Sequence, residues 1–572
     1  MQTSSDHSKQ SPEKNILYDA KQLSESESSL DNSSAYGLEQ SYTVNNALNE
    51  IGFGRYQLQL FFVAGLGWLG ESFPPLAIPS DFIQLTICGS SEYLLNPRTP
   101  LTLLRAIAVS LTWIDYEFQP YKFEMATLAL YVGLVIGATF FGLTADIFGR
   151  RLSFNLSLFL CGAFGTAIGS ANSFVSFSAM AAGVGLGLGG NLPVDGALLL
   201  EFLPAKQQWL LTLLSSFWAV GLLISSVAVW GFISQPQWAC DEAMAAAGNC
   251  NWDTNAGWRY GLFVVGGFTM LMFVMRVIVL PIKESPKFYL SQGKDDKAIA
   301  VIEHVAKKNR KECPLSLEKM KAATRHLGLE FEAAPQKFTK RELISRNLSQ
   351  MNLDHIKPLF ATKRLAINTI LLMTSWALIG LAYPLYNSFL PTYLNGKTNS
   401  DTYHTYRDYT IQAVLGIPGS LIAAALVEVK GRWFGRRGAM AVFSILTGVF
   451  IFLFSSTTQP DSVLAFECVV SLTQNAMYGI LFAYTPEAFP GPHRATGDAL
   501  CSSLNRLFGL LAPIIHAFGA KAGSPTPLYV SGALLIFSGL SQFFLPIESK
   551  WGVVDTAAYL TIHFAAAGRS AM

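Results

Sequence analysis

Polar and charged side chains lie inside several long apolar runs of the sequence, where each costs free energy unless it meets water or a partner. We predict that ten of them line a substrate cavity: Asn191, Asp195, Tyr383, Tyr386, Asn387, Gln474, Asn475, Tyr478, Asn505 and Arg506. Aromatic and amide groups suit a small polar organic molecule. Arg506 is a cation inside a span: either it pairs with Asp195 or Asp498, or it binds the carboxylate of an anionic substrate.

Two acidic side chains are candidates for proton coupling, Glu71 and Asp195. Burial raises the pKa of a carboxylate, so an acid inside a span can take up and release a proton near neutral pH. We therefore expect protons as the coupling ion, although the residues alone leave sodium open.

Membrane-spanning helices must position these side chains. The chain has 572 residues, of which 51% are hydrophobic and 14% charged, whereas soluble proteins have about 25% charged residues. Apolar runs of about 20 residues, the length that crosses a ~30 Å hydrocarbon core, recur along the chain. The sequence therefore predicts an all-α polytopic protein of the lipid bilayer. A net charge of +2 argues against a nucleic-acid partner.

Twelve spans are expected. Eleven lie near 124–145, 152–171, 178–203, 209–234, 260–282, 364–393, 409–429, 438–456, 463–486, 496–519 and 527–546. A first segment begins near Tyr56, but prolines and polar residues break it after Ser72. Deleting 73–103 would restore one span of about 27 residues, acceptable with tilt. We interpret 73–103 as an insertion; without it, Glu71 would lie in the middle of the first span.

The loop charges fix an orientation. Basic residues gather in the loops at 150–151, 206 and 430–437 and in the linker 284–358, which an even number of spans places on one side. Loop 235–257 on the opposite side has three acids and no Lys or Arg. The positive-inside rule then makes the basic side, and both termini, cytosolic. Cys240 and Cys250 fall on the oxidising side, where a small structural disulfide is expected.

The domain boundaries follow from the same pattern. We expect a disordered cytosolic tail at 1–45, because its composition cannot bury enough apolar surface to fold. An N-terminal bundle of six helices at 46–283 precedes the basic linker 284–358. A C-terminal bundle at 359–548 and a cytosolic tail at 549–572 complete the chain.

An internal repeat relates the two bundles. Gly149-Arg150-Arg151 recurs as Gly435-Arg436-Arg437, and Glu201 recurs as Glu487, both at an offset of 286 residues. Parallel halves joined by a long loop are typical of a transporter that rocks about a site at the membrane midplane.

Several motifs carry a resemblance to a known family. The run 142–151, GLTADIFGRR, resembles the signature loop between helices 2 and 3 of the major facilitator superfamily (MFS). Trp258-Arg259-Tyr260 and the run 284–290, ESPKFYL, resemble the sugar-porter signature after helix 6. The runs 189–196, GGNLPVDG, and 484–490, YTPEAFP, are similar to the branch that contains synaptic-vesicle-2-related proteins, niacin transporters and fungal orphan carriers. The resemblance covers 50–72 and 104–548.

The resemblance implies two pseudo-symmetric six-helix bundles with gate or latch residues at their cytosolic ends. The candidates are Asp146, Gly149, Arg150, Arg151, Glu201, Glu428, Arg436, Arg437 and Glu487. Asp146 can pair with Arg150 or a helix terminus. Because a buried acid needs a partner, we predict that Glu201 pairs with Arg151, and Glu487 with Arg437.

These features predict a secondary active transporter that moves a carboxylate, sugar-like or nicotinate-like solute by alternating access. We expect a monomer in the plasma membrane, or in a vacuolar membrane, that needs no cofactor or metal. The chain has no GxxxxGK[ST] or HExxH motif, so neither an ATP-driven pump nor a zinc hydrolase is indicated, and we expect no enzyme. The alternative is a non-transporting relative that acts as a nutrient receptor or binds proteins.

Overall fold

A computed structural model describes residues 32–69, 110–325, 357–387, 390, 402–427, 435–489, 494–519 and 525–547, apart from 112, 205, 206, 208, 239, 241, 280 and 361. Every regular element in these ranges is a helix. The proposed insertion 73–103, Glu71, Glu428 and the tail 549–572 lie outside the described residues.

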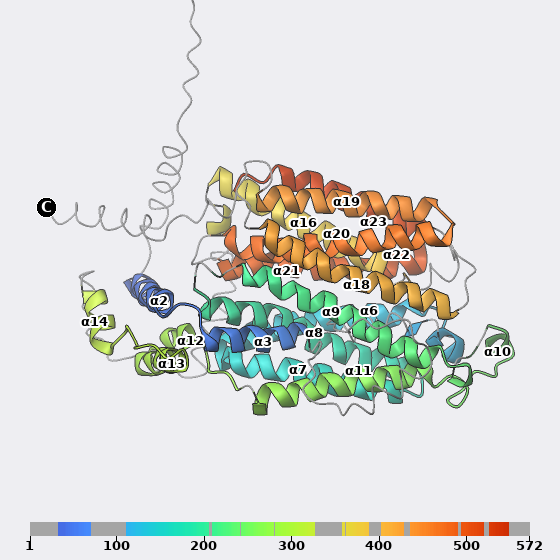
Figure 1. Cartoon of the computed structure of the whole chain (residues 1–572), viewed down its shortest axis with the longest axis horizontal. Coiled ribbons are helices and arrows are strands. Elements are labelled where there is room, and N and C mark those ends of the chain that lie inside the picture. The colour runs from blue at the N-terminus through green and yellow to red at the C-terminus, as the bar shows by residue number, and fades with distance from the viewer. Residues whose placement is uncertain are drawn as a thin grey trace, which may run out of the picture.

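Two groups of long helices form the body of the molecule (Figure 1). The first group consists of α3 (Arg55–Leu69), α6 (Glu124–Phe148), α7 (Arg150–Ala167), α8 (Phe174–Phe202), α9 (Leu210–Ile233) and α11 (Gly257–Val274). The second consists of α16 (Lys363–Asn387), α18 (Thr402–Leu426), α19 (Arg436–Ser456), α20 (Pro460–Glu487), α21 (Arg494–Gly509) with α22 (Leu511–Gly519), and α23 (Thr526–Phe543). We call the two groups the N-bundle and the C-bundle.

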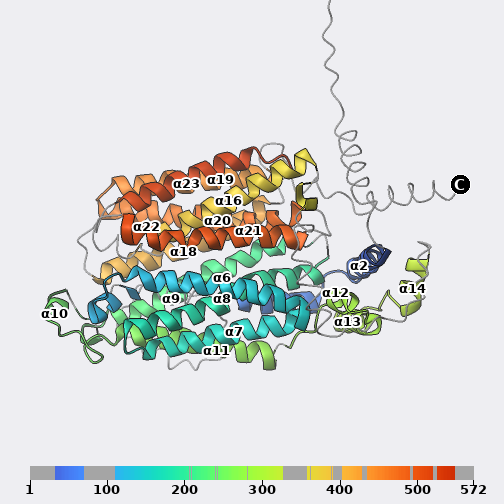
Figure 2. The same ribbon diagram turned by 180° about the vertical axis from the view of Figure 1, so that it is seen from behind.

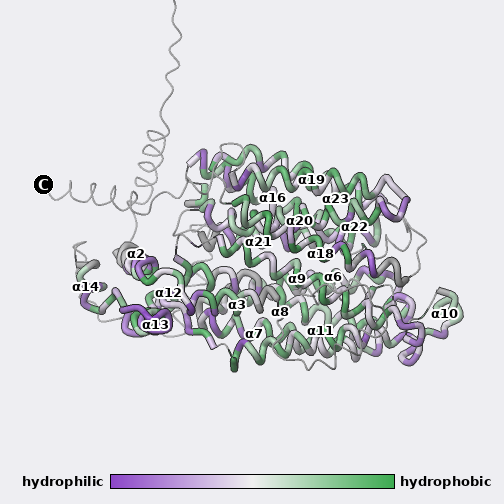
Figure 3. The backbone as a smooth tube through the Cα atoms, in the orientation of Figure 1, coloured by the Kyte–Doolittle hydropathy of each residue, from purple (hydrophilic) through white to green (hydrophobic). Residues whose placement is uncertain are grey.

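Nine helices in the described part of the chain are long and apolar enough to cross a membrane. Thr410–Leu426 is a shorter apolar helix, and α3 has 15 residues up to the edge of the described range. Apolar residues dominate the tubes of both bundles, and hydrophilic residues gather beyond their ends (Figure 3). The expected all-α membrane architecture is confirmed.

The two ends of the body differ. At one end lie α2 (Asn32–Ile51), α12 (Pro286–Ser291), α13 (Asp295–Lys308) and α14 (Leu317–Arg325); we call this the linker end. At the other lies α10 (Glu242–Ala246), between Cys240 and Cys250; we call it the disulfide end. Seen from behind, the same helices project beyond the bundles (Figure 2). Four short elements, η1 (Ile168–Ser170), η3 (Pro236–Trp238), the π-helical turn η4 (Met275–Val279) and η6 (Lys357–Phe360), complete the described structure.

Helix α2 overlaps the tail expected at 1–45. Its apolar residues Val44, Ala47, Leu48 and Ile51 recur at helical spacing and are buried. They pack against α12, α13 and α14 in one apolar cluster with the linker end of the N-bundle. Helix α2 forms because this apolar face packs against the linker helices, a contact that the composition of the tail does not reveal.

Close helix contacts hold the bundles together. A Cβ atom added at Gly185 of α8 would lie 2.1 Å from the carbonyl oxygen of Leu130 in α6, so only glycine allows this approach. Between the bundles, α9 packs against α18 and α20. The span expected at 496–519 is present as one candidate span, Gly497–Phe518; a turn at Leu510 divides it into α21 and α22, because Pro513 has no N–H to donate to the carbonyl of Gly509.

Candidate functional site

Two ion pairs at the linker end occupy equivalent positions of the internal repeat. The guanidinium of Arg150 pairs with Glu201, and that of Arg436 pairs with Glu487. Each pair joins the first turn of one helix, α7 or α19, to the last residues of another, α8 or α20. The 286-residue repeat thus produces the same interaction in both bundles.

The partners expected for these two glutamates were wrong by one residue. Successive helical side chains point about 100° apart, so only the first arginine after each glycine faces the neighbouring helix. The next one points elsewhere: Arg437 Nη1 donates to the carbonyl of Leu545 at 2.5 Å, and Arg151 is exposed. The side chain of Asp146 lies outside the described residues.

Glu284 caps the N-terminus of α7. Its carboxylate accepts hydrogen bonds from the backbone N–H groups of Arg150 at 3.0 Å and Arg151 at 3.1 Å, a favourable place for an anion. Gly149, between α6 and α7, has φ +108°, and a Cβ there would lie 2.4 Å from Glu284 Oε2. Burial raises the pKa of Glu284, and these hydrogen bonds oppose that shift.

Asp195 pairs with Arg276, which the sequence interpretation did not consider. Arg276 Nη2 lies 2.9 Å from Asp195 Oδ2, and neither side chain is exposed. Arg276 Nη1 also donates to Asn191 Oδ1 at 3.3 Å. The pair stands within the N-bundle, so Asp195 is not the partner of Arg506.

Arg506 lies where the two bundles meet. On α21 of the C-bundle, it donates to Ser502 Oγ at 2.7 Å and across the interface to the carbonyl of Gly189 in α8 at 3.3 Å. Within the described ranges no carboxylate lies within 4.0 Å of it, and Asp498 acts on it only from farther away. Among the described residues, the guanidinium charge of Arg506 is therefore stabilised by hydrogen bonds to neutral oxygen atoms and not by an ion pair.

The expected amides of the C-bundle fall into separate contacts. Asn387 Nδ2 donates to Gln474 Oε1 at 3.0 Å, which links α16 to α20. Asn475 bonds back to the carbonyl of Ser471 in its own helix. Asn505 Nδ2 donates to the carbonyl of Trp376 at 3.2 Å. Of these four predicted amides, only Asn387 and Gln474 contact each other.

Four aromatic rings form a cluster between the bundles. Trp218 of α9 lies 4.8 Å from Tyr478, 6.2 Å from Tyr383 and 5.9 Å from Phe482, by ring centroids. Tyr383 and Tyr478 are 5.5 Å apart. The buried Nε1 of Trp218 has no hydrogen-bond partner in the described part of the chain. Two predicted tyrosines therefore share this cluster, whereas Tyr386 packs against Phe454 inside the C-bundle.

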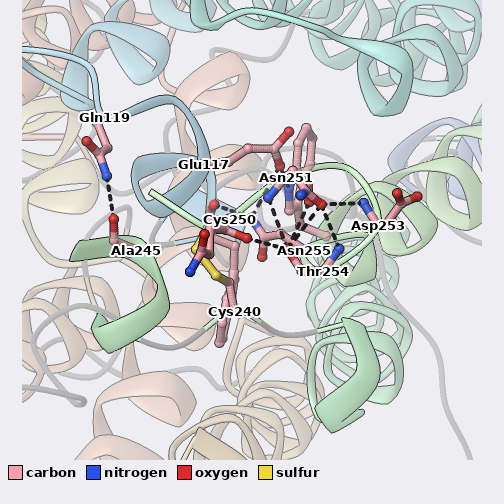
Figure 4. The surroundings of a disulfide bond; sticks show 12 residues. Glu117, Gln119, Cys240, Ala245, Cys250, Asn251, Asp253, Thr254 and Asn255 are labelled. Atoms are coloured by element: carbon pink, nitrogen blue, oxygen red, sulfur yellow. Dashed lines mark hydrogen bonds between the residues drawn. A yellow bond between two sulfur atoms is a disulfide. The ribbon is translucent and has the colours of Figure 1, made fainter. Parts of the chain in front are cut away.

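A buried polar network caps the N-bundle at the disulfide end (Figure 4). Cys240 and Cys250 form a disulfide. Near it, Glu117 pairs with Arg259 and accepts hydrogen bonds from Trp258 Nε1 at 3.0 Å and Asn255 Nδ2 at 3.2 Å. The network ties residues 113–118 to the start of α11.

The bundles also touch at the disulfide end. His516 Nδ1 of α22 lies 3.0 Å from Glu124 Oε1 of α6. Lys122 Nζ donates to the carbonyl of Ala517 at 2.6 Å. These contacts hold the two bundles together on this side.

Sequence reasoning missed four residues that these sites depend on. Arg276 was detectable as a lone cation inside the span expected at 260–282, the same signal that marked Arg506. Glu117 followed the broken first span, where hydropathy gave no register. Trp218 and Phe482 had no signal, because aromatic residues are common in every span. The described residues offer no group of three His, Cys, Asp or Glu side chains that could hold a metal ion.

Residues 115–552 match the family "Sugar (and other) transporter". The chain is 40% identical over 527 residues to an uncharacterised MFS-type transporter of Schizosaccharomyces pombe, with 90% of this chain and 89% of that one covered. It is 39% identical to MFS siderochrome iron transporter 1 of Ceriporiopsis subvermispora, with coverage of 89% and 90%. It is 24% identical to the niacin transporter NiaP of Acinetobacter baylyi, with coverage of 82% and 88%.

The fold agrees. The xylose transporter XylE of Escherichia coli, in a partially occluded inward-open conformation, superposes with a TM-score of 0.60 at 13% identity, covering 85% of this chain and 96% of XylE. The chain therefore belongs to the sugar transporter family of the major facilitator superfamily. It is a multi-pass membrane transporter, not an enzyme.

Proposed function

We propose that the protein is a proton-coupled secondary transporter of a small organic carboxylate, working by alternating access. The observation that carries the substrate class is Arg506: a cation at the bundle interface whose described hydrogen bonds all go to neutral oxygens. A carboxylate can bind its guanidinium through charge-assisted bonds. The niacin transporter among the relatives supports an anionic solute of this size.

The surroundings of Arg506 suit an organic acid with a ring. Tyr131 of α6 approaches Gly509, one turn beyond Arg506, closely enough that a Cβ there would lie 2.8 Å from the ring. Trp218, Tyr383 and Tyr478 offer further aromatic surface between the same bundles. We propose that the solute enters between α8 and α21, its carboxylate at Arg506 and its apolar part toward these rings.

We also propose an orientation of the protein in the membrane. Charges in the loops favour a cytosolic linker end, which would place both termini in the cytosol. The Cys240–Cys250 disulfide is consistent with an oxidising exterior at the opposite end. We propose a monomer in the plasma membrane.

Uptake into liposomes that contain the full chain tests the substrate class. We expect labelled nicotinate to accumulate when the outside is acidic, and a protonophore to abolish this accumulation. Nicotinamide, the neutral amide of the same ring, is the matched solute and should not accumulate. Equal transport of nicotinate and nicotinamide, or preference for xylose over every carboxylate, would refute the proposal.

The variant Arg506→Gln tests the residue. A charged hydrogen bond contributes about 1.5–3 kcal/mol, so we expect the half-saturation concentration for nicotinate to rise roughly 10- to 150-fold. Arg407→Gln is the control, because Arg407 pairs with its neighbour Asp408 on α18. Unchanged half-saturation in Arg506→Gln would contradict the assignment.

A further inference from the structure

One arginine in the π-helical turn at the end of α11 is buried in the N-bundle. The turn covers Met275–Val279. Ile278 and Val279 are 70% and 61% exposed, whereas Arg276 is 1% exposed. An arginine on the lipid-facing surface is costly, and Arg276 lies instead on the buried face of the helix, at the helical spacing of the buried residues Thr269 and Met272. Such turns are frequent at functional sites.

The guanidinium of Arg276 joins four helices of the N-bundle. Its Nη2 donates to the carbonyl of Val63 in α3 at 3.2 Å and to Asp195 in α8 at 2.9 Å. Its Nη1 donates to the carbonyl of Phe154 in α7 at 2.7 Å and to Asn191 at 3.3 Å. Three other helices thus depend on one side chain of the sixth span.

Asp195 is only half satisfied by this arrangement. Oδ2 accepts from Arg276, but Oδ1 is buried with no hydrogen-bond partner among the described residues. A buried acceptor without a donor carries a desolvation cost. Arg276 is the charged group that acts on Asp195 from the described helices packed against it; the polar neighbours are Asn191 and, through it, Ser157. A proton on Oδ1 would remove the uncompensated charge density at that atom.

The pair lies next to the place where the solute is proposed to bind. Arg506 touches α8 at the carbonyl of Gly189, and Asp195 follows six residues later, about 9 Å along the helix axis. Asn191, which contacts Arg276, lies between them. One helix therefore carries both the interface contact and the buried ion pair.

We propose that Asp195 and Arg276 form the proton-coupling pair of the transporter, with Arg276 as a positioning residue that keeps Oδ1 of Asp195 ready for the proton. This inference rests on the proposed function. A proton from one side of the membrane binds Oδ1 and neutralises the carboxylate, which weakens its bond to Arg276. The guanidinium charge, no longer balanced, then favours an anion near Gly189. Departure of the anion reverses the sequence, and the proton leaves on the other side.

Transport by the full chain in liposomes tests the coupling. Asp195→Asn should keep nicotinate exchange between equal pools but lose accumulation driven by a proton gradient. Arg276→Gln should lose accumulation as well, and Arg276→Lys, which keeps the charge, should restore part of it. Glu117→Gln breaks the other buried pair of the N-bundle and should still accumulate nicotinate per folded molecule. Accumulation by Asp195→Asn at the wild-type level would overturn the proposal.

A measurement without solute separates this inference from the proposed function. Amide hydrogen exchange at Met275–Val279, corrected for its intrinsic pH dependence, should rise in the wild-type protein as the pH falls, because protonated Asp195 releases Arg276. In Asp195→Asn it should be high at every pH, and in Glu117→Gln it should follow the wild type. Protection that does not change with pH in the wild type would overturn the proposal, whether or not nicotinate is transported. If Asp195→Asn fails to fold, the neutral pair Asp195→Asn/Arg276→Gln serves instead.

Discussion

The repeated arginine–glutamate pairs predict an asymmetry between the two bundles. Glu487→Gln leaves Arg436 without its anion, and the side chain of Arg436 is only 6% exposed. Removing one partner of a buried pair costs about 3–5 kcal/mol. Glu201→Gln has the same chemistry, but Arg150 is 22% exposed, so water can approach its guanidinium. There we expect about 1.5–2 kcal/mol, near the lower range for a charged hydrogen bond.

Thermal unfolding of the purified protein in detergent measures the difference. For a unit of 150–250 residues, 1 kcal/mol shifts Tm by roughly 2–4 °C. The expected losses are therefore about 6–20 °C for Glu487→Gln and about 3–8 °C for Glu201→Gln. The double variant Glu487→Gln/Arg436→Gln should recover part of the loss, because it leaves no lone buried charge. Equal losses in both bundles, or a double variant less stable than the single one, would refute the reasoning.

Three further predictions concern the ends of the molecule. Because the folded-state pKa of Glu284 is raised above its ordinary value of 4.5, the folded state binds this proton more tightly, so stability should fall as the pH rises above 4.5. Glu284→Gln should flatten that part of the Tm–pH profile, and an unchanged profile would contradict it. Cys240→Ser/Cys250→Ser opens a disulfide with a sequence separation of 10 and should cost about 3 kcal/mol by loop entropy; a Tm that reductant lowers in the wild type but not in the variant would check this. Leu48→Asp puts a charge on the buried face of α2 and should make the N-terminus sensitive to limited proteolysis, with Glu50→Gln on the exposed face as the control.

Periodicity and internal comparison predicted the helices and the paired glutamates, because both depend on local apolar length and on a repeat visible within one chain. Neither kind of evidence could show which of the two adjacent arginines after each glycine pairs with the glutamate. That choice depends on the angular position of Arg150 and Arg436 at the start of their helices. A shift of one residue rotates a side chain by about 100°.

Other parts of the site depend on contacts between distant segments. Arg276 continues the helical spacing of the buried face of α11, but its partners on three other helices follow only from the way those helices pack around it. The choice of Arg276 rather than Arg506 as the partner of Asp195 follows from the arrangement of α8 against α11 within one bundle. Likewise, Trp218 meets Tyr383 and Tyr478 only across the interface between the bundles.

The cap at the disulfide end sets an order for biosynthesis. Glu117 and Arg259 are separated by 142 residues, and ribosomes add roughly 5–20 residues per second. Glu117 is therefore synthesised roughly 7–30 s before Arg259. During that interval the carboxylate has no ion-pair partner, because Arg259 lies at the start of the sixth span. Substitutions at Arg259 would leave that acid without its ion pair permanently, so their main effect should appear in cells as retention and degradation of the newly made chain rather than as altered transport by molecules that mature.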